Sequence, residues 1–260
     1  MLPNKSGQLV VQTRDRHLLR ELSLMRVIDR EQAKMVGGFP SIRLVNRRLL
    51  ALTRAGLLKR FFIGTETGWK KSLYSLSPSG AKLVQVPYRS PRRRPDEMLT
   101  IDFAVYHQLG INEIYCALRY QPVPLADTRL VRWEVSQSPI DSKSSLKPDA
   151  YLEIQSAQKT VSAFLEFDLG HENLVIWNAK VQKYLRYAVS GEFERVFHEP
   201  QFRVLVVTNS DRRREALRKA TAAITDKIFW FTTADSIHQQ GFWSPIWSRA
   251  QGDHEPASLL

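Results

Sequence analysis

Hydrophobic residues in the first part of the chain recur at helical spacing, which predicts three short helices. Leucines three and four positions apart predict an amphipathic helix over residues 13–25. Asp29 followed by Gln32 has the form of a capping box and predicts a second helix that ends at Gly37. Ser41 is placed to cap a third helix, whose apolar stripe is Ile42, Val45, Leu49 and Leu52.

A hairpin and a linker follow these helices. Residues 57–63 and 69–76 predict two strands around a glycine-bounded turn, and Ser77-Pro78 starts a further helix that runs to about Val84. Residues 87–95 hold three prolines and three consecutive arginines without apolar periodicity, as is typical of a linker. We therefore place an N-terminal arm at 1–12, a first domain at 13–86 and a basic linker at 87–95.

The remaining sequence alternates helical and strand patterns, which predicts an α/β domain with a mixed sheet over residues 96–250, followed by a tail at 251–260. The predicted order is helix, three strands, helix, strand, helix, strand. The predicted helices cover residues 96–118, 176–188 and 212–224, and the strands cover 129–136, 147–154, 161–168, 202–208 and 228–232.

Charge is distributed unevenly between the two predicted domains. Residues 1–95 hold 20 Lys and Arg against 5 Asp and Glu, whereas residues 96–260 hold 18 against 21. A strongly basic segment predicts contact with a polyanion, and nucleic acid is the obvious one. Cys116 is the single cysteine, and the sequence contains no signal-peptide pattern or membrane-length apolar run. We expect a cytoplasmic protein that binds no membrane.

Basic side chains gather where a DNA-reading helix would place them. Arg43 and Arg47 fall opposite the apolar stripe of the third helix, with Asn46 and Arg48 beside it. Arginine binds guanine and phosphate well, so this helix suits a major groove; the alternative is a solvated helix face. The candidate DNA-binding residues are Arg43, Asn46, Arg47, Arg48, Lys70, Lys71, Arg92, Arg93 and Arg94.

Three helices followed by a basic hairpin resemble a winged helix-turn-helix domain. The resemblance covers residues 13–84 and rests on the segment RLLALTRAGLLKR and the hairpin that ends in YSLSPSG. It implies binding of double-stranded DNA.

Three carboxylates in the second domain are arranged to converge on one cation. Asp149 opens one predicted strand, and Glu166 and Asp168 stand two positions apart on the next, so they share a face. Such acids suit Mg²⁺ or Mn²⁺ and phosphodiester chemistry. The alternative is a turn aspartate and an edge-strand acid, although an acid within AFLEFDL is costly to bury unless it is paired or metal-bound.

This strand order, with Pro148-Asp149 on the second strand and Glu166-Phe167-Asp168 on the third, resembles the PD-(D/E)XK nuclease superfamily. The resemblance implies that Asp149 and Glu166 bind metal, with the Phe167 carbonyl as a further ligand. Asp168 stands where the superfamily has a lysine. Three explanations stay open: Lys180 or Lys183 on the next helix replaces that lysine; Asp168 is itself a ligand and the metal activates water; or the site no longer cuts.

Nearly the whole chain resembles the bacterial replication-relaxation family of plasmid and mobile-element proteins. The resemblance rests on the segments PDAYLEI, FLEFDLGHE, KVQKY, RVLVVT and WFTTADSI before SPIW. Members commonly show a glutamate-x-aspartate-x-glycine-x-glutamate run, matched here by Glu166, Asp168, Gly170 and Glu172.

The sequence therefore predicts an α/β protein: an N-terminal winged helix-turn-helix domain, then a PD-(D/E)XK restriction-endonuclease-like domain with a mixed central sheet. Its first predicted function is metal-dependent nicking or cleavage of bound DNA, with Asp149, Glu166 and Asp168 as ligands and Lys180 or Lys183 near the scissile phosphate. The alternative is a non-catalytic regulator of transcription or replication, in which the second domain serves dimerisation or recognition of DNA shape. The partners are double-stranded DNA, a second copy of the chain, and other replication or mobilisation proteins. We interpret Tyr184 and Tyr187 as packing residues.

Overall fold

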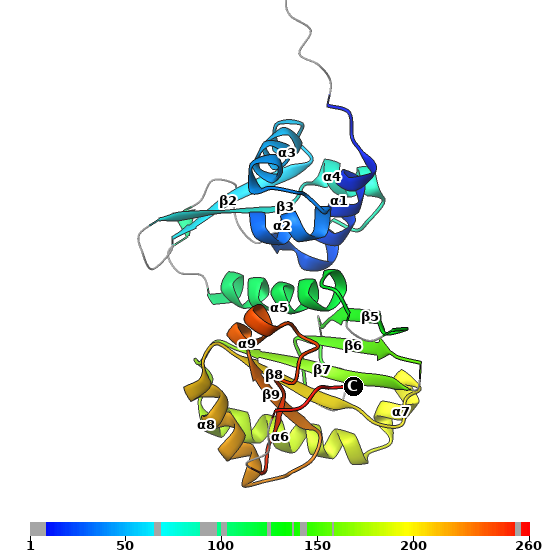
Figure 1. The fold of residues 1–260 in the computed structure, drawn as a ribbon, viewed down its shortest axis with the longest axis vertical. Coiled ribbons are helices and arrows are strands. Elements are labelled where there is room, and N and C mark those ends of the chain that lie inside the picture. The colour runs from blue at the N-terminus through cyan, green and yellow to red at the C-terminus, as the bar shows by residue number, and fades with distance from the viewer. Residues whose placement is uncertain are drawn as a thin grey trace, which may run out of the picture. The chain divides into compact units, whose positions relative to one another are not determined.

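The computed structural model describes residues 9–64, 69–88, 98–99, 103–123, 126–136, 138–140, 145–157, 159–252 and 256–260. Two compact units, residues 1–112 and 113–260, divide the chain (Figure 1). The division falls inside α5 (Phe103–Tyr120). The domain limits drawn at the 87–95 linker stay a prediction, because residues 89–97 lie outside the described part.

The first unit contains the three predicted helices, α1 (Thr13–Met25), α2 (Arg30–Gly37) and α3 (Ile42–Arg54). Asp29 caps α2 by accepting a hydrogen bond from the Gln32 amide at 2.9 Å. Ser41 caps α3 through the Leu44 amide. The leucines and valine predicted to face inward on these helices are buried, so the helical spacing read from the sequence also placed the core of this unit.

The predicted hairpin is also present, as β2 (Leu58–Gly64) and β3 (Lys70–Leu76) in antiparallel pairing. It lies in a four-stranded sheet of order β1-β3-β2-β4, where β1 is Val27–Ile28 and β4 is Met98–Leu99. The helix α4 (Pro78–Val84) follows, with the Ser77 hydroxyl accepting from the Gly80 amide.

The helix predicted from Asp96 begins later than expected. Met98 and Leu99 pair instead with Phe62 and Ile63 of β2, in parallel, and α5 begins at Phe103. The prediction was wrong at these two residues because main-chain groups at the open edge of a hairpin can be satisfied by another strand. Sequence periodicity carries no information on such long-range pairing.

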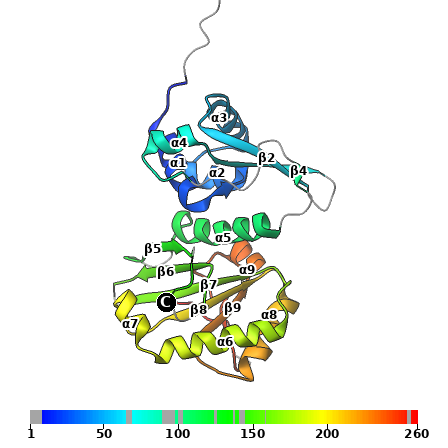
Figure 2. The same cartoon turned by 180° about the vertical axis from the view of Figure 1, so that it is seen from behind.

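The second unit is built on a six-stranded mixed sheet of order β10-β9-β8-β7-β6-β5 (Figure 2). Its strands are β5 (Arg129–Val135), β6 (Ala150–Gln155), β7 (Thr160–Asp168), β8 (Arg203–Thr208), β9 (Phe229–Thr233) and β10 (Ser248–Arg249). Strands β5, β6 and β7 are antiparallel neighbours, whereas β7, β8 and β9 run parallel. The predicted mixed sheet is confirmed.

Helices cover this sheet. They are α6 (Leu174–Val189), α7 (Glu192–Phe197), α8 (Asp211–Ala222) and α9 (Ala234–Gln240). Three of them, α6, α7 and α8, contribute side chains to its core. Trp177 of α6 donates from its indole nitrogen to the Thr221 hydroxyl of α8 at 2.9 Å, which ties the two helices together over Phe164 and Phe229. Glu166 and Asp168 follow Phe164 at every second position of β7, so both point toward α6 and α8.

Candidate functional site

The candidate site begins where β7 runs on past β6. The pairing of these strands ends at Ala150 and Leu165, whereas on its other edge β7 stays paired with β8 as far as Asp168. Asp149 comes directly before the first residue of β6, and its Oδ2 accepts a hydrogen bond from the Phe167 amide at 2.7 Å. A side-chain carboxylate thus accepts the main-chain hydrogen bond that a carbonyl of a neighbouring strand would otherwise accept.

Glu166 lies beside Asp149 and is buried under α6. Its Oε2 accepts from the Lys180 ammonium at 3.0 Å, and its Oε1 accepts from the Tyr184 hydroxyl at 2.5 Å. Lys180 and Tyr184 are four residues apart on α6, so successive turns of one helix face supply both donors. Tyr184 therefore does more than pack, which was its predicted role.

Burial and charge set the ionisation of this cluster. Burial raises the pKa of Glu166 to about 7; Lys180 opposes this rise, and the nearby Asp149 carboxylate adds to it. Burial alone would lower the pKa of Lys180, but Glu166 and Glu172 outweigh it and raise that pKa. Burial, and then Glu166, raise the pKa of the Tyr184 hydroxyl. The cluster therefore combines a carboxyl group whose pKa lies near neutral pH with an ammonium that stays charged at that pH.

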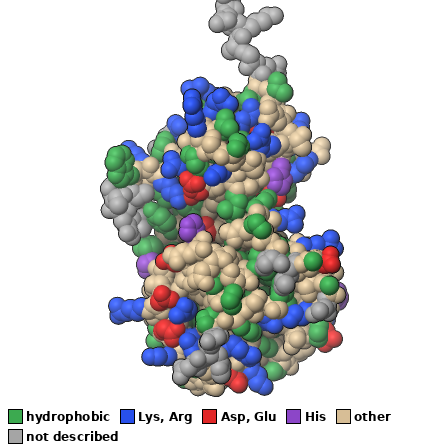
Figure 3. Space-filling view, viewed as in Figure 1, with side chains coloured by type: hydrophobic (Ala, Val, Ile, Leu, Met, Phe, Trp, Pro, Cys, Tyr) green, Lys and Arg blue, Asp and Glu red, His purple; other side chains and the backbone are tan. Residues whose placement is uncertain are grey.

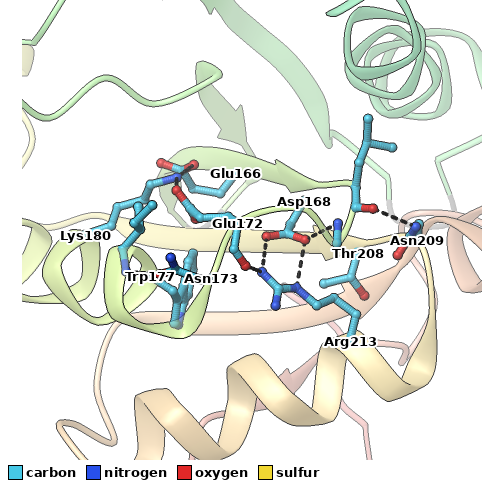
Figure 4. Close-up of polar contacts among 12 residues, drawn as sticks. Glu166, Asp168, Glu172, Asn173, Trp177, Lys180, Thr208, Asn209 and Arg213 are labelled. Atoms are coloured by element: carbon cyan, nitrogen blue, oxygen red, sulfur yellow. Dashed lines mark hydrogen bonds and ion pairs between the residues drawn. The ribbon is translucent and has the colours of Figure 1, made fainter. Parts of the chain in front are cut away.

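Asp168 has a different partner, although it is only two residues away. Arg213 of α8 binds it with two nitrogens, Nε at 2.9 Å from Oδ1 and Nη2 at 2.7 Å from Oδ2 (Figure 4). The Gly170 amide also donates to Asp168, at 2.5 Å. Within the described residues, no group of three His, Cys, Asp or Glu side chains is arranged to hold a metal.

The two candidate lysines also separate. Lys180 contacts Glu166, whereas Lys183 donates to the Ser145 hydroxyl at 2.6 Å. Sequence reasoning missed Tyr184 and Arg213 as parts of this region. Tyr184 could have been found, because it stands one turn after Lys180. Arg213 could not, because it is 45 residues from Asp168 along the chain and no local pattern connects them.

The candidate DNA-binding residues of α3 also differ among themselves. Arg43, Asn46 and Arg47 are exposed. Arg48 instead turns inward to Asp15 of α1, a fully buried carboxylate, with Nε at 2.7 Å from Oδ1, and it also donates to the Val10 carbonyl. Figure 3 shows Lys and Arg side chains gathered on the first unit where Figure 1 draws α3.

The hairpin lysines divide in the same way. Lys70 is exposed, whereas the Lys71 ammonium forms an ion pair with Asp29, the cap of α2, at 2.5 Å. Trp69 beside them is 76% exposed. Arg92, Arg93 and Arg94 lie outside the described residues.

The fold and these contacts define a mixed α/β chain that joins a helix-and-hairpin unit with a basic helix face to a sheet unit with a buried carboxylate–lysine cluster. A family model described as replication-relaxation matches residues 19–199. The chain belongs to the replication-relaxation family, and its predicted membership is confirmed. No curated protein and no solved structure matches the chain. None of the helices in the described part is long and apolar enough to cross a membrane.

Proposed function

We propose that the chain is a DNA-binding protein of a plasmid or mobile genetic element, and that its second unit is a metal-dependent DNA nuclease. The observation that carries the proposal is the grouping of Asp149, Glu166 and Lys180 at the point where β7 leaves β6. Two acids and a lysine at such a strand end are the components of a PD-(D/E)XK site.

The strand order supports this proposal. An antiparallel run of β5, β6 and β7 followed by parallel β8 and β9 agrees with the order expected for that superfamily. Of the three explanations for Asp168, we adopt the one in which a helix lysine replaces the missing strand lysine, because Lys180 reaches Glu166 while Asp168 is bound by Arg213.

The acids fit a divalent cation such as Mg²⁺ or Mn²⁺. Mg²⁺ commonly takes one or two protein carboxylates and keeps several waters, so Asp149 and Glu166 suffice as side-chain ligands, with the Phe167 carbonyl as a further candidate. Their mutual repulsion, which adds to the raised pKa of Glu166, is what a bound cation would relieve. When bound there, such an ion would supply Lewis-acid stabilisation and lower the pKa of a bound water.

The protein's own side chains have separate tasks in this proposal. Lys180 holds a positive charge next to Glu166, where it can donate hydrogen bonds to the attacking water or to a phosphate oxygen. Tyr184 fixes the second oxygen of Glu166 and so sets the orientation of that carboxylate. Both act from one helix, α6, which keeps their spacing constant.

DNA would be held by the first unit. The helix order and the hairpin support a winged helix-turn-helix assignment, with α3 as the helix that enters the major groove. Arg43, Asn46 and Arg47 are the residues available for base and phosphate contacts, and Lys70 is available on the hairpin. Arg48 and Lys71 serve the fold instead, through Asp15 and Asp29.

The decisive experiment is cleavage of supercoiled DNA with Mg²⁺ or Mn²⁺. We expect the wild type to produce nicked or linear DNA, and Glu166→Gln and Lys180→Met to lose at least about 100-fold in rate. Glu153→Gln is the matched control, because Glu153 is a strand acid that binds Arg132 and Tyr151 away from this cluster. Equal cutting by the wild type and Glu166→Gln would overturn the proposal.

A second candidate function is a non-catalytic DNA-binding regulator. One observation favours it: both oxygens of Glu166 already accept hydrogen bonds from side chains of the protein. It predicts salt-sensitive DNA binding without cleavage or metal dependence. Replacing Arg43 and Arg47 with glutamate should abolish binding under either function, so cleavage and metal dependence are the measurements that separate them. A second copy of the chain and other replication or mobilisation proteins stay predicted partners.

A further inference from the structure

The turn between β7 and α6, residues 169–173, accepts hydrogen bonds from two side chains. One is Arg213 of α8 and the other is Asn209, which precedes α8 in the chain. The Arg213 guanidinium binds the Asp168 carboxylate before the turn and donates to the Glu172 carbonyl near its end. Asn209 donates from its side-chain amide to the Leu169 carbonyl at 2.9 Å. One guanidinium thus joins the two ends of a five-residue turn (Figure 4).

Gly170 makes this turn tight enough to close on itself. Its φ of +88° is a conformation that residues with a Cβ rarely adopt, and its amide donates a hydrogen bond back to the Asp168 carboxylate at 2.5 Å. Asn173 then caps α6 by accepting from the Ile176 amide at 2.9 Å. The turn therefore holds Glu172 directly before Asn173, the N-cap of α6.

Glu172 uses that place to contact Lys180. Its Oε1 lies 3.3 Å from the Lys180 ammonium, which lies 3.0 Å from Glu166. The ammonium is held between two carboxylates, one from the sheet and one from the turn. Moving the turn would move the second carboxylate.

We infer that Arg213 and Asp168 are a positioning pair, which fixes the β7–α6 turn so that Glu172 holds Lys180 against Glu166. The consequence for DNA cleavage rests on the proposed function, but the positioning itself does not. Asp168, the residue that departs from the nuclease pattern, thereby has a role that needs no bound metal.

The position of Arg213 in α8 argues against a generic surface arginine. It stands in the first turn of the helix, where the partial positive charge of the helix end disfavours a cation. The side chain is only 14% exposed and makes a two-nitrogen contact to a carboxylate that is 7% exposed. A fork of fixed donors explains why arginine, and not lysine, suits this site.

The test is site-resolved acylation of lysines with N-hydroxysuccinimidyl acetate, in mildly alkaline buffer with a chelator and without DNA. An ammonium held between two carboxylates reacts slowly, and release from Glu172 should raise its reactivity. We expect several-fold faster labelling of Lys180 in Arg213→Gln and in Glu172→Gln, with Lys183 unchanged as the internal reference. The double variant should label no faster than Glu172→Gln, because both changes remove the same contact.

Arg214→Gln is the matched control, since Arg214 neighbours Arg213 but binds Asp211 and Glu215. Should Arg213→Gln fail to fold, Asp168→Asn removes the carboxylate that holds the same guanidinium and should raise Lys180 labelling in the same direction. Unchanged Lys180 labelling in a folded Arg213→Gln or Asp168→Asn variant, or additive effects in the double variant, would overturn the inference. Because the assay contains neither DNA nor metal, its outcome is independent of whether the protein cuts DNA.

Discussion

Glu166 and Asp168 stand two residues apart on one face of one strand, yet their surroundings differ. Glu166 contacts a lysine and a tyrosine of α6, and burial, with a smaller contribution from the Asp149 carboxylate, raises its pKa. Asp168 is matched by a two-nitrogen contact to Arg213 and by the Gly170 amide. The difference teaches that the spacing of acids in a motif sets the face they share, whereas partners from distant helices decide what each acid can do.

Removing the Asp168 carboxylate should have the largest effect on stability. Asp168→Ala leaves the Arg213 guanidinium buried without its partner, so we expect a loss of about 3–5 kcal/mol in the free energy of unfolding. Glu166→Gln keeps acceptor atoms for Tyr184 and should cost less. Urea unfolding of both variants measures the contrast. A larger loss in Glu166→Gln would reverse the roles assigned to the two acids.

The same contrast occurs between two adjacent arginines of α3, and it predicts opposite phenotypes. Arg48→Met leaves the buried Asp15 carboxylate with the Gln12 amide but without its cation, so we expect about 2–3 kcal/mol less stability. Arg47→Met should leave stability within about 0.5 kcal/mol, because the side chain is exposed, and should weaken DNA binding about tenfold. Unfolding curves and fluorescence anisotropy with duplex DNA check the pair. Equal stability losses would contradict the division.

Much of the fold could be predicted from the sequence because its signals are local. The stripe on α3, the caps Asp29 and Ser41, and the apolar run of β8 all depend on residues within a few positions of one another. Short elements escaped prediction: β1 and β10 have two residues each, and their existence depends on partner strands elsewhere in the chain.

The candidate site was predictable only in part, because some of its contacts join residues that are far apart in the chain. Asp149, Glu166 and Lys180 stood out because an acid in an apolar strand and a lysine on the following helix are visible in sequence. Which lysine reaches Glu166 depended on how α6 is rotated about its own axis against the sheet. That rotation places Lys180 and Tyr184 against Glu166, whereas Lys183 reaches Ser145. The role of Arg213 depended on the packing of α8, which no motif records.

The raised pKa of Glu166 predicts a pH dependence of stability that Glu166→Gln should remove. A carboxyl whose folded pKa, about 7, exceeds its unfolded value stabilises the fold when protonated. That contribution is complete below about pH 4 and is lost as the pH rises through 7. The raised pKa of Lys180 keeps its ammonium charged over this pH range, so its own ionisation does not change the stability with pH.

We therefore expect the stability of Glu166→Gln relative to the wild type to increase by about 2 kcal/mol between about pH 5 and pH 8. Urea unfolding in a chelator at several pH values measures this change. Asp168→Asn is the comparison, and it should not reproduce the trend. A difference between wild type and Glu166→Gln that stays constant with pH would show that Glu166 is ionised throughout.

The hairpin lysines should show the smallest contrast, and they test how far the division between ion-paired and exposed cations extends. Lys71→Met removes the ion pair with Asp29, but Lys71 is 38% exposed and Asp29 still caps α2, so we expect a loss below about 1 kcal/mol. Lys70→Met should leave unfolding unchanged and weaken DNA binding only slightly, with a shallower dependence on salt. Binding measured over a salt series separates the two variants. A salt slope reduced by Lys71→Met and not by Lys70→Met would place the Lys71 ammonium on DNA and not on Asp29.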